Sequence, residues 1–113
     1  MSQIITNVIG GIYHPYAFES LTVSSSAIPL TASVYNTVAV TSGANPLRQV
    51  QYVVITTETN SIRYRYDGTA PTASIGHLMT AGTALVLIGY DTITQFQAIA
   101  SGADATIMVT YEC

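Results

Sequence analysis

The alternation of apolar and polar positions is clearest where Ile62, Tyr64 and Tyr66 are interleaved with Arg63 and Arg65. Successive side chains of a strand point to opposite faces, so this stretch predicts a half-buried strand with the aromatic face in a core. The two arginines then lie on the other face.

A turn is expected directly after this strand. Asp67 tolerates unusual backbone geometry and bonds its own downstream backbone, and Gly68 permits a positive φ without steric cost. Pro71 lacks an N–H group and cannot continue a ladder of backbone hydrogen bonds. We therefore predict a structural turn at Asp67, Gly68 and Pro71.

Other strands are predicted along the chain. Residues 50–58 form a β-branched run, and in 105–111 the side chains of Ile107, Val109 and Tyr111 share one face. The run 84–90 is apolar in both phases, which predicts a central strand, or a strand whose outer face meets a partner. The remaining predicted strands are 18–24, 28–34, 36–41, 76–79 and 94–100.

Thr59 and Asn60 separate the run 50–58 from the Ile62 strand, and this spacing predicts a two-residue hairpin loop. The expected cross-strand pairs are Ile55–Tyr64, Val53–Tyr66, Thr56–Arg63 and Val54–Arg65.

Turn signals recur about every ten residues, and no segment shows a convincing amphipathic helical pattern. The sequence therefore predicts an all-β fold, an antiparallel β-sandwich of about seven or eight strands. Jelly-roll and Greek-key wiring both remain open.

Residues 1–16 are predicted to be an extended N-terminal arm, ahead of a β-sandwich domain at 17–113. Its β-branched residues and the pair Gly10-Gly11 disfavour a helix. The arm is either an edge strand of the domain's own core or a segment that docks on a neighbouring subunit or a different protein. The residues expected to make that contact are Ile4, Ile5, Val8, Ile9, Tyr13 and Tyr16.

Composition changes this picture, because only 8% of the 113 residues are charged and none is lysine. A soluble chain ordinarily carries roughly a quarter of charged residues. Lysine is also a common device that keeps sheet edges from pairing with other chains. We expect a partner to cover part of this domain, the alternative being an unusually stable β-domain with a neutral surface.

The net charge of −3 and the three arginines, Arg48, Arg63 and Arg65, exclude the basic surface that nucleic-acid binding needs. No apolar run is long enough to span a membrane, and residues 1–7 lack the basic region of a signal peptide. Cys113 is expected to be exposed at a frayed terminus, and it fits folding in a reducing compartment.

No catalytic residue, cofactor or metal ligand is predicted. The six acidic residues are scattered, His14 and His77 lie far apart, and the G-x-S-x-G signature is absent. Among the tyrosines, Tyr64, Tyr66 and Tyr111 are expected to pack in the core. The others of interest, Tyr13, Tyr16 and Tyr52, are candidates for interface anchors or for stacking on sugar rings.

The second half of the chain contains a set of motifs that belong together. They are 62–72, Gly76-His77-Leu78-Met79, Ala81-Gly82, 85–89, Phe96-Gln97-Ala98-Ile99-Ala100 and 106–111. In these motifs the chain resembles small structural proteins of tailed bacteriophages that are encoded among the head genes.

The resemblance implies a virion component assembled in the host cytoplasm, a head decoration or cement protein. Such a protein is expected to sit on the major capsid protein as a homotrimer of β-sandwiches and to bind neither nucleic acid nor membrane. A tail or head-fibre accessory protein is the neighbouring interpretation. For packing in the core or between subunits we expect Leu85, Leu87 and Ile88.

Part of the same stretch is also similar to fibronectin-like modules appended to bacterial glycosidases. The shared pattern is a strand that ends in Asp-Gly-Thr-Ala-Pro-Thr, followed by a strand with Ala-x-Ala. This second resemblance implies a carbohydrate-binding β-sandwich module as the alternative.

Overall fold

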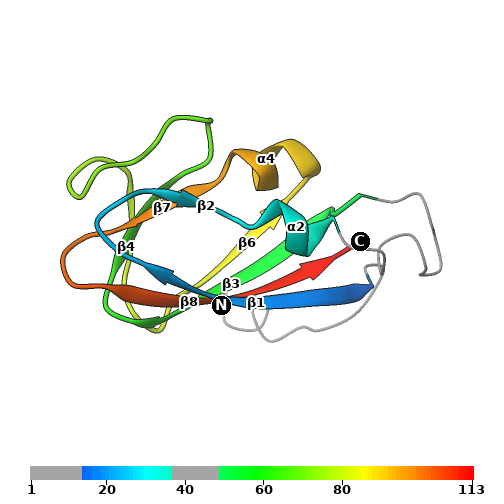
Figure 1. Ribbon diagram of the computed structural model, residues 1–113, viewed down its shortest axis with the longest axis horizontal. Coiled ribbons are helices and arrows are strands. Elements are labelled where there is room, and N and C mark those ends of the chain that lie inside the picture. The colour runs from blue at the N-terminus through cyan, green and yellow to red at the C-terminus, as the bar shows by residue number, and fades with distance from the viewer. Residues whose placement is uncertain (1–13, 37–48) are drawn as a thin grey trace, which may run out of the picture.

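The computed structural model describes residues 14–36 and 49–113, which form a sandwich of two antiparallel four-stranded sheets (Figure 1). The first sheet has the strand order β1-β8-β3-β6 and the second has the order β2-β7-β4-β5. The predicted all-β sandwich is therefore confirmed. Its elements are β1 (Pro15–Val23), β2 (Ile28–Pro29), α2 (Ala32–Tyr35), β3 (Tyr52–Thr59), β4 (Ile62–Arg65), β5 (His77–Met79), β6 (Ala84–Ile88), α4 (Tyr90–Gln95), β7 (Gln97–Ala100) and β8 (Ala105–Glu112).

The strand pairing is nested, because β1 pairs with β8, β2 with β7, β3 with β6 and β4 with β5. An antiparallel ribbon that is rolled up on itself acquires this pairing, which is the jelly roll. The sequence left jelly-roll and Greek-key wiring open, and the pairing decides for the jelly roll.

The core lies between the sheets and is filled by the alternate residues of the strands. On β8, Ile107, Val109 and Tyr111 are each at most 1% exposed, as their shared phase predicts. Val53 and Ile55 on β3 are completely buried beside them. The alternation that was read from the sequence thus places these strands correctly in the core.

The predicted hairpin between residues 50–58 and the Ile62 strand is wrong. β3 belongs to the first sheet and β4 to the second, so Ile55 pairs with Leu85 instead of Tyr64, and none of the four expected cross-strand pairs forms. Asn60 has φ 61°, and the register of β3 on β8 shifts just before it. The connection therefore turns the chain into the other layer instead of returning it along the same sheet.

Of the two interpretations of the run 84–90, the central strand is wrong, because β6 is an edge strand of the first sheet. Leu87 is buried in the core and Leu85 packs against it, whereas Ile88 on the opposite face is 60% exposed. The run is apolar in both phases because its outer face is apolar, and not because both faces are covered.

Two predicted strands are shorter than expected. The strand 28–34 is reduced to β2 and is followed by α2, and the strand 94–100 begins only at Gln97, after α4. Gly89 has φ 99° between β6 and α4, a conformation that ends the strand and that glycine adopts without steric cost. Apart from Asn36, the predicted strand 36–41 lies outside the described residues.

Cys113 is not at a frayed terminus, because it is 5% exposed and its backbone is paired. The Cys113 N–H donates to the carbonyl of His14 at 2.9 Å, and the His14 N–H donates to the Cys113 carbonyl at 2.7 Å. These two bonds extend the β1–β8 ladder by one residue on each strand.

Candidate functional site

The outer face of the first sheet carries almost no charge. Its side chains alternate with the buried ones, and one row crosses all four strands in register, Phe18 on β1, Thr110 on β8, Val54 on β3 and Val86 on β6. We define the outer face by the residues Phe18, Ser20, Thr22, Tyr52, Val54, Thr56, Ala84, Val86, Ile88, Thr106, Met108 and Thr110.

The most exposed apolar side chains of this outer face are at its two edges. Phe18 and Ile88 are each 60% exposed, although β1 and β6 each pair with one neighbouring strand. Large exposed apolar side chains that share one sheet face mark an interaction surface more often than scattered ones do. The outer face can therefore bury Phe18 and Ile88 together against one flat partner.

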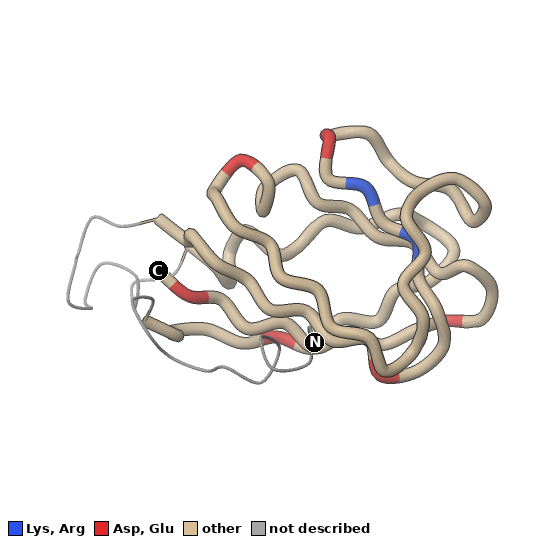
Figure 2. The backbone as a smooth tube through the Cα atoms, turned by 180° about the vertical axis from the view of Figure 1, so that it is seen from behind, with Lys and Arg blue, Asp and Glu red and all other residues tan. Residues whose placement is uncertain are grey.

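Charged residues are sparse along the described backbone (Figure 2). Among the described residues, the arginines Arg63 and Arg65 lie on β4 of the second sheet. The described outer face of the first sheet has acidic residues only near strand ends, Glu58 and Glu112. Desolvation of a surface costs much less free energy where it carries no charged side chains, and this suits a surface that becomes buried in an assembly.

The structure places only part of the predicted partner-binding set. Ile4, Ile5, Val8, Ile9 and Tyr13 lie outside the described residues, so their role stays a prediction. Tyr16 lies in β1, where its hydroxyl donates to the carbonyl of Tyr35 at 2.6 Å. Burial raises the pKa of Tyr16, so its hydroxyl keeps its proton and remains a donor.

The three residues predicted for subunit packing point to two different faces of β6. Leu85 and Leu87 belong to the core of the domain, and Ile88 is the member of this set that points outward. A neighbouring subunit would therefore meet Ile88 and not Leu87.

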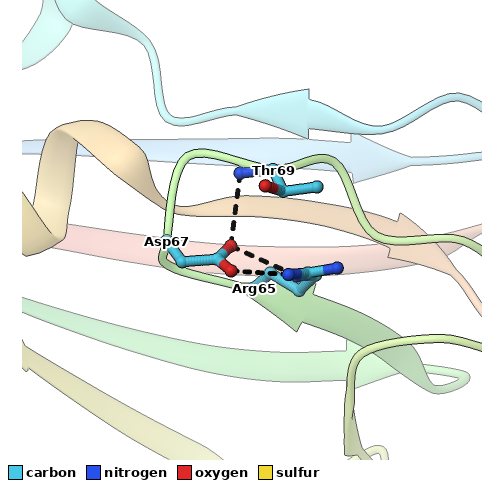
Figure 3. Close-up of polar contacts among 3 residues, drawn as sticks. All are labelled: Arg65, Asp67 and Thr69. Atoms are coloured by element: carbon cyan, nitrogen blue, oxygen red, sulfur yellow. Dashed lines mark hydrogen bonds and ion pairs between the residues drawn. The ribbon is translucent and has the colours of Figure 1, made fainter.

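A second group of functional side chains lies at the end of β4. Arg65 donates two hydrogen bonds to the carboxylate of Asp67, from Nε at 3.2 Å and from Nη2 at 2.5 Å (Figure 3). Asp67 also accepts the Thr69 N–H at 3.2 Å, and Gly68 between them has φ 84°. The hydrogen bond from Arg65, with the Thr69 N–H, lowers the pKa of Asp67 below its ordinary value.

Four aromatic rings connect this turn with the core. Phe96 is 1% exposed and stacks on Tyr64 at a centroid distance of 5.6 Å; Tyr64 contacts His77 at 5.3 Å, and His77 stacks on Tyr66 at 5.9 Å. Tyr66 is 50% exposed, so its predicted place in the core is wrong. The strand β4 ends at Arg65, and Tyr66 therefore follows the last paired residue.

A pocket of about 480 Å³ opens beside the two outermost rings. It is lined by Arg65, Tyr66, Asp67, Ile75, Gly76 and His77. These residues come from the end of β4, the start of β5 and the connection between them.

The connection between β4 and β5 is fixed by hydrogen bonds. The Arg63 guanidinium donates from Nη1 to the Gly76 carbonyl at 2.9 Å and from Nε to the Ala73 carbonyl at 3.2 Å. The Thr72 hydroxyl accepts the Ile75 N–H at 2.9 Å, and the Thr72 N–H donates to the Ile75 carbonyl at 2.9 Å. One wall of the pocket is therefore built before any ligand arrives.

Sequence reasoning did not group the residues of this pocket. The hairpin assignment paired Tyr66 with Val53, although β4 instead pairs with β5 and brings Tyr64 opposite His77. The available signal was the Asp67-Gly68 turn, because a strand that stops there leaves Tyr66 beyond its end.

The described residues form neither a metal site nor a membrane-spanning helix. Among these residues, no three His, Cys, Asp or Glu side chains come together where they could hold a metal ion. Neither α2 nor α4 is long and apolar enough to cross a membrane, and the rest of the described chain adds no such helix. Comparison of the sequence and structure with protein-family models, curated proteins and solved structures gives no match.

Proposed function

We propose that this protein is a non-enzymatic structural component of a bacteriophage virion, a decoration or cement protein that binds the assembled head and stabilises it. The observation that carries the proposal is the uncharged outer face of the first sheet, with Phe18, Val54 and Val86 in one row across it. The resemblance of the second half of the chain to phage structural proteins supports the same function.

The jelly-roll architecture is compatible with this function. Jelly rolls form viral capsid domains and also lectin domains. The function must therefore be argued from the surfaces of the domain and not from its fold. Here the outer face of the first sheet is a broad surface, and the residues that define it carry no charged side chain. Such a surface fits a partner that is itself a flat, repetitive protein shell. We propose the major capsid protein as that partner.

The proposed mechanism is mass action. A protein that binds the assembled lattice and not its loose subunits stabilises the lattice by RT ln(1 + L/Kd) per site, where L is its free concentration, because binding shifts the equilibrium toward the assembled state. Burial of the outer face supplies the hydrophobic part of the binding free energy, at roughly 25 cal/mol for each Å² of apolar surface.

We further propose that the decorating unit is a homotrimer. Ile88 is exposed on the edge strand β6, which is free of lysine and proline, two devices that ordinarily blunt an edge. Equilibrium sedimentation of the purified protein measures the mass directly, and a monomer at all concentrations would contradict this part of the proposal.

The decisive experiment uses virions of the phage that encodes this chain, prepared from a strain in which its gene is deleted. Wild-type protein added to these particles should co-sediment with them and raise the temperature at which they release their DNA. Phe18→Lys should abolish both effects, since it places a charge within the proposed contact, where that charge would have to be desolvated.

Leu78→Lys is the matched control. Leu78 is 53% exposed on β5 of the second sheet, close to the 60% exposure of Phe18, and the substitution adds the same charge. It should leave particle binding unchanged. Equal loss of binding in both variants would show that charge alone, and not the outer face, decides binding.

A further inference from the structure

We propose that the pocket formed by Tyr66, His77, Arg65 and Asp67 binds a neutral sugar residue of pyranose type. The exposed Tyr66 ring and the Arg65–Asp67 pair line one pocket, so an apolar stacking surface and a set of polar groups face the same volume. This inference concerns the second sheet and does not depend on the virion function proposed above.

The apolar half of the site is the Tyr66 ring with His77. The rings of Tyr66 and His77 stack at 5.9 Å with an interplanar angle of 22°, and Tyr64 lies 6.4 Å from Tyr66. The face of an aromatic ring carries partial negative charge, and the axial C–H groups of a pyranose carry partial positive charge. A half-exposed tyrosine that is backed by other rings is therefore a rigid platform for one sugar face.

The polar half of the site is the Arg65–Asp67 pair. Its bonds use Nε and Nη2 of Arg65 and leave Nη1 outside the pair, while the Asp67 oxygens can accept further hydrogen bonds. Adjacent donors and acceptors match neighbouring hydroxyl groups, each of which both donates and accepts. The pair has no net charge, which favours a neutral polyol over a phosphate or a carboxylate.

The size and rigidity of the pocket fit this ligand. Its volume of about 480 Å³ lies in the range of small-molecule sites, roughly 300 to 1,000 Å³. Arg63 and Thr72 hold the wall that contains Ile75 and Gly76, so little conformational entropy is lost when a sugar binds.

The test is a titration of the full-length ¹⁵N-labelled protein, followed by two-dimensional NMR. The probes are glucose, galactose, mannose and N-acetylglucosamine, each as the free sugar and as an oligosaccharide with that sugar at its end. We expect at least one probe to shift the amide signals of Tyr66, Asp67 and His77 in a saturable way. Absence of such shifts with all of the probes would overturn the proposal.

Two variants separate stacking from unspecific binding. Tyr66→Ala should weaken the affinity by about tenfold, because it removes the stacking surface. Tyr66→Phe keeps the ring and should stay within about twofold of wild type. Equal affinity for wild type and Tyr66→Ala would overturn the assignment of the site.

Phe18→Ala is the control for an exposed aromatic ring elsewhere, since Phe18 is 60% exposed on the first sheet. It should bind sugar like wild type. The two proposals fail separately, because Tyr66→Ala should still bind virions and Phe18→Lys should still bind sugar. Loss of sugar binding in Phe18→Ala would overturn the site at Tyr66.

Discussion

Glu19 shows how a single polar side chain connects distant parts of the sandwich. It lies on the edge strand β1 and accepts a hydrogen bond from the Tyr111 hydroxyl of β8 and one from the Thr31 N–H at 3.2 Å. Burial, together with this bond to Glu19, raises the pKa of Tyr111, so the hydroxyl remains a donor. A charge that points inward from an edge strand also discourages that edge from pairing with other chains.

We expect Glu19→Ala to lower the free energy of unfolding by about 1 to 3 kcal/mol, because it leaves the fully buried Tyr111 hydroxyl without an acceptor. Glu19→Gln keeps an acceptor oxygen and should cost clearly less. Urea denaturation of the three proteins measures the difference. Equal losses for Ala and Gln would show that the charge, and not the hydrogen bond, matters.

Thr57, unlike Glu19, is a polar side chain whose burial is not compensated by a hydrogen bond to any described residue. Its side chain is 1% exposed on the core face of β3, and in the described part of the structure its Oγ1 is buried without a hydrogen-bond partner. Thr57→Val replaces the hydroxyl by a methyl group of similar size, so we expect stabilisation of about 1 kcal/mol. A thermal melt checks this, and a lower melting temperature for the valine variant would contradict it.

Glu112 makes stability depend on pH. It is 8% exposed, and burial raises its pKa above the ordinary value of 4.5. The folded state therefore holds the proton more tightly than the unfolded state, and the resulting stabilisation is present below pH 4.5 and is lost as the pH rises through the raised pKa.

We expect Glu112→Gln, which stays neutral, to be more stable than wild type at neutral pH and nearly equal to it below pH 4.5. Urea unfolding of both proteins across this range gives the difference directly. A stability difference that stays constant from acid to neutral pH would rule out this role of Glu112.

At the scale of elements, alternation along the sequence predicts strands better than it predicts their neighbours. Ile107, Val109 and Tyr111 are buried as expected, because side-chain phase is a local property. The strands that pair with β3 are distant from it in the sequence. Its register is set by β6 and β8, and the turn at Asn60 leads out of the sheet, which the spacing of 50–58 and Ile62 does not reveal.

The pocket was only partly predictable, because it too depends on strand pairing between residues that are distant in sequence. The turn chemistry of Asp67 and Gly68 is legible in the sequence, and both residues take part in the turn. The pairing of β4 with β5, which brings His77 beside Tyr64 and Tyr66, depends on tertiary structure. The outer face of the first sheet was anticipated from the missing lysine and from the run 84–90, whose two apolar phases allowed a strand with a partner on its outer face.

Gly76 is a position in the β4–β5 connection where a larger residue would be crowded. It has φ 138°, and a Cβ there would lie 3.1 Å from the Tyr64 carbonyl oxygen and 3.2 Å from Cβ of Pro71. We expect Gly76→Ala to destabilise the fold by about 1 to 3 kcal/mol through backbone strain and this crowding.

Gly82→Ala is the matched control for Gly76→Ala. Gly82 has φ 83°, and no atom lies within 4 Å of a Cβ placed there, so this variant carries backbone strain alone. Thermal melts of both variants separate strain from crowding. A loss in Gly82→Ala as large as that in Gly76→Ala would show that crowding at Gly76 contributes nothing.

At the scale of the whole molecule, the two proposed surfaces belong to different sheets. The outer face lies on β1, β8, β3 and β6, and the pocket is built from β4, β5 and their connection. A protein that uses the first sheet to sit on a shell would keep the second sheet's pocket available to solvent.

Deletion of residues 1–12 tests the predicted arm. All strands of the described sandwich lie beyond this deletion, so we expect the shortened protein to melt within a few degrees of the full chain. Its co-sedimentation with virions should be lost if the arm contacts the capsid. An unfolded product in circular dichroism would instead identify the arm as a strand of the domain.

The pairing of β1 with β8 has a kinetic consequence. Glu19 and Tyr111 are 92 positions apart in the chain, yet they bond to each other across this pair. During synthesis β1 must therefore wait, without its partner, until the residues of β8 have left the ribosome. Such distant pairing slows folding to roughly milliseconds to seconds. We expect the unfinished chain, which carries few charged side chains, to be prone to aggregation during that time.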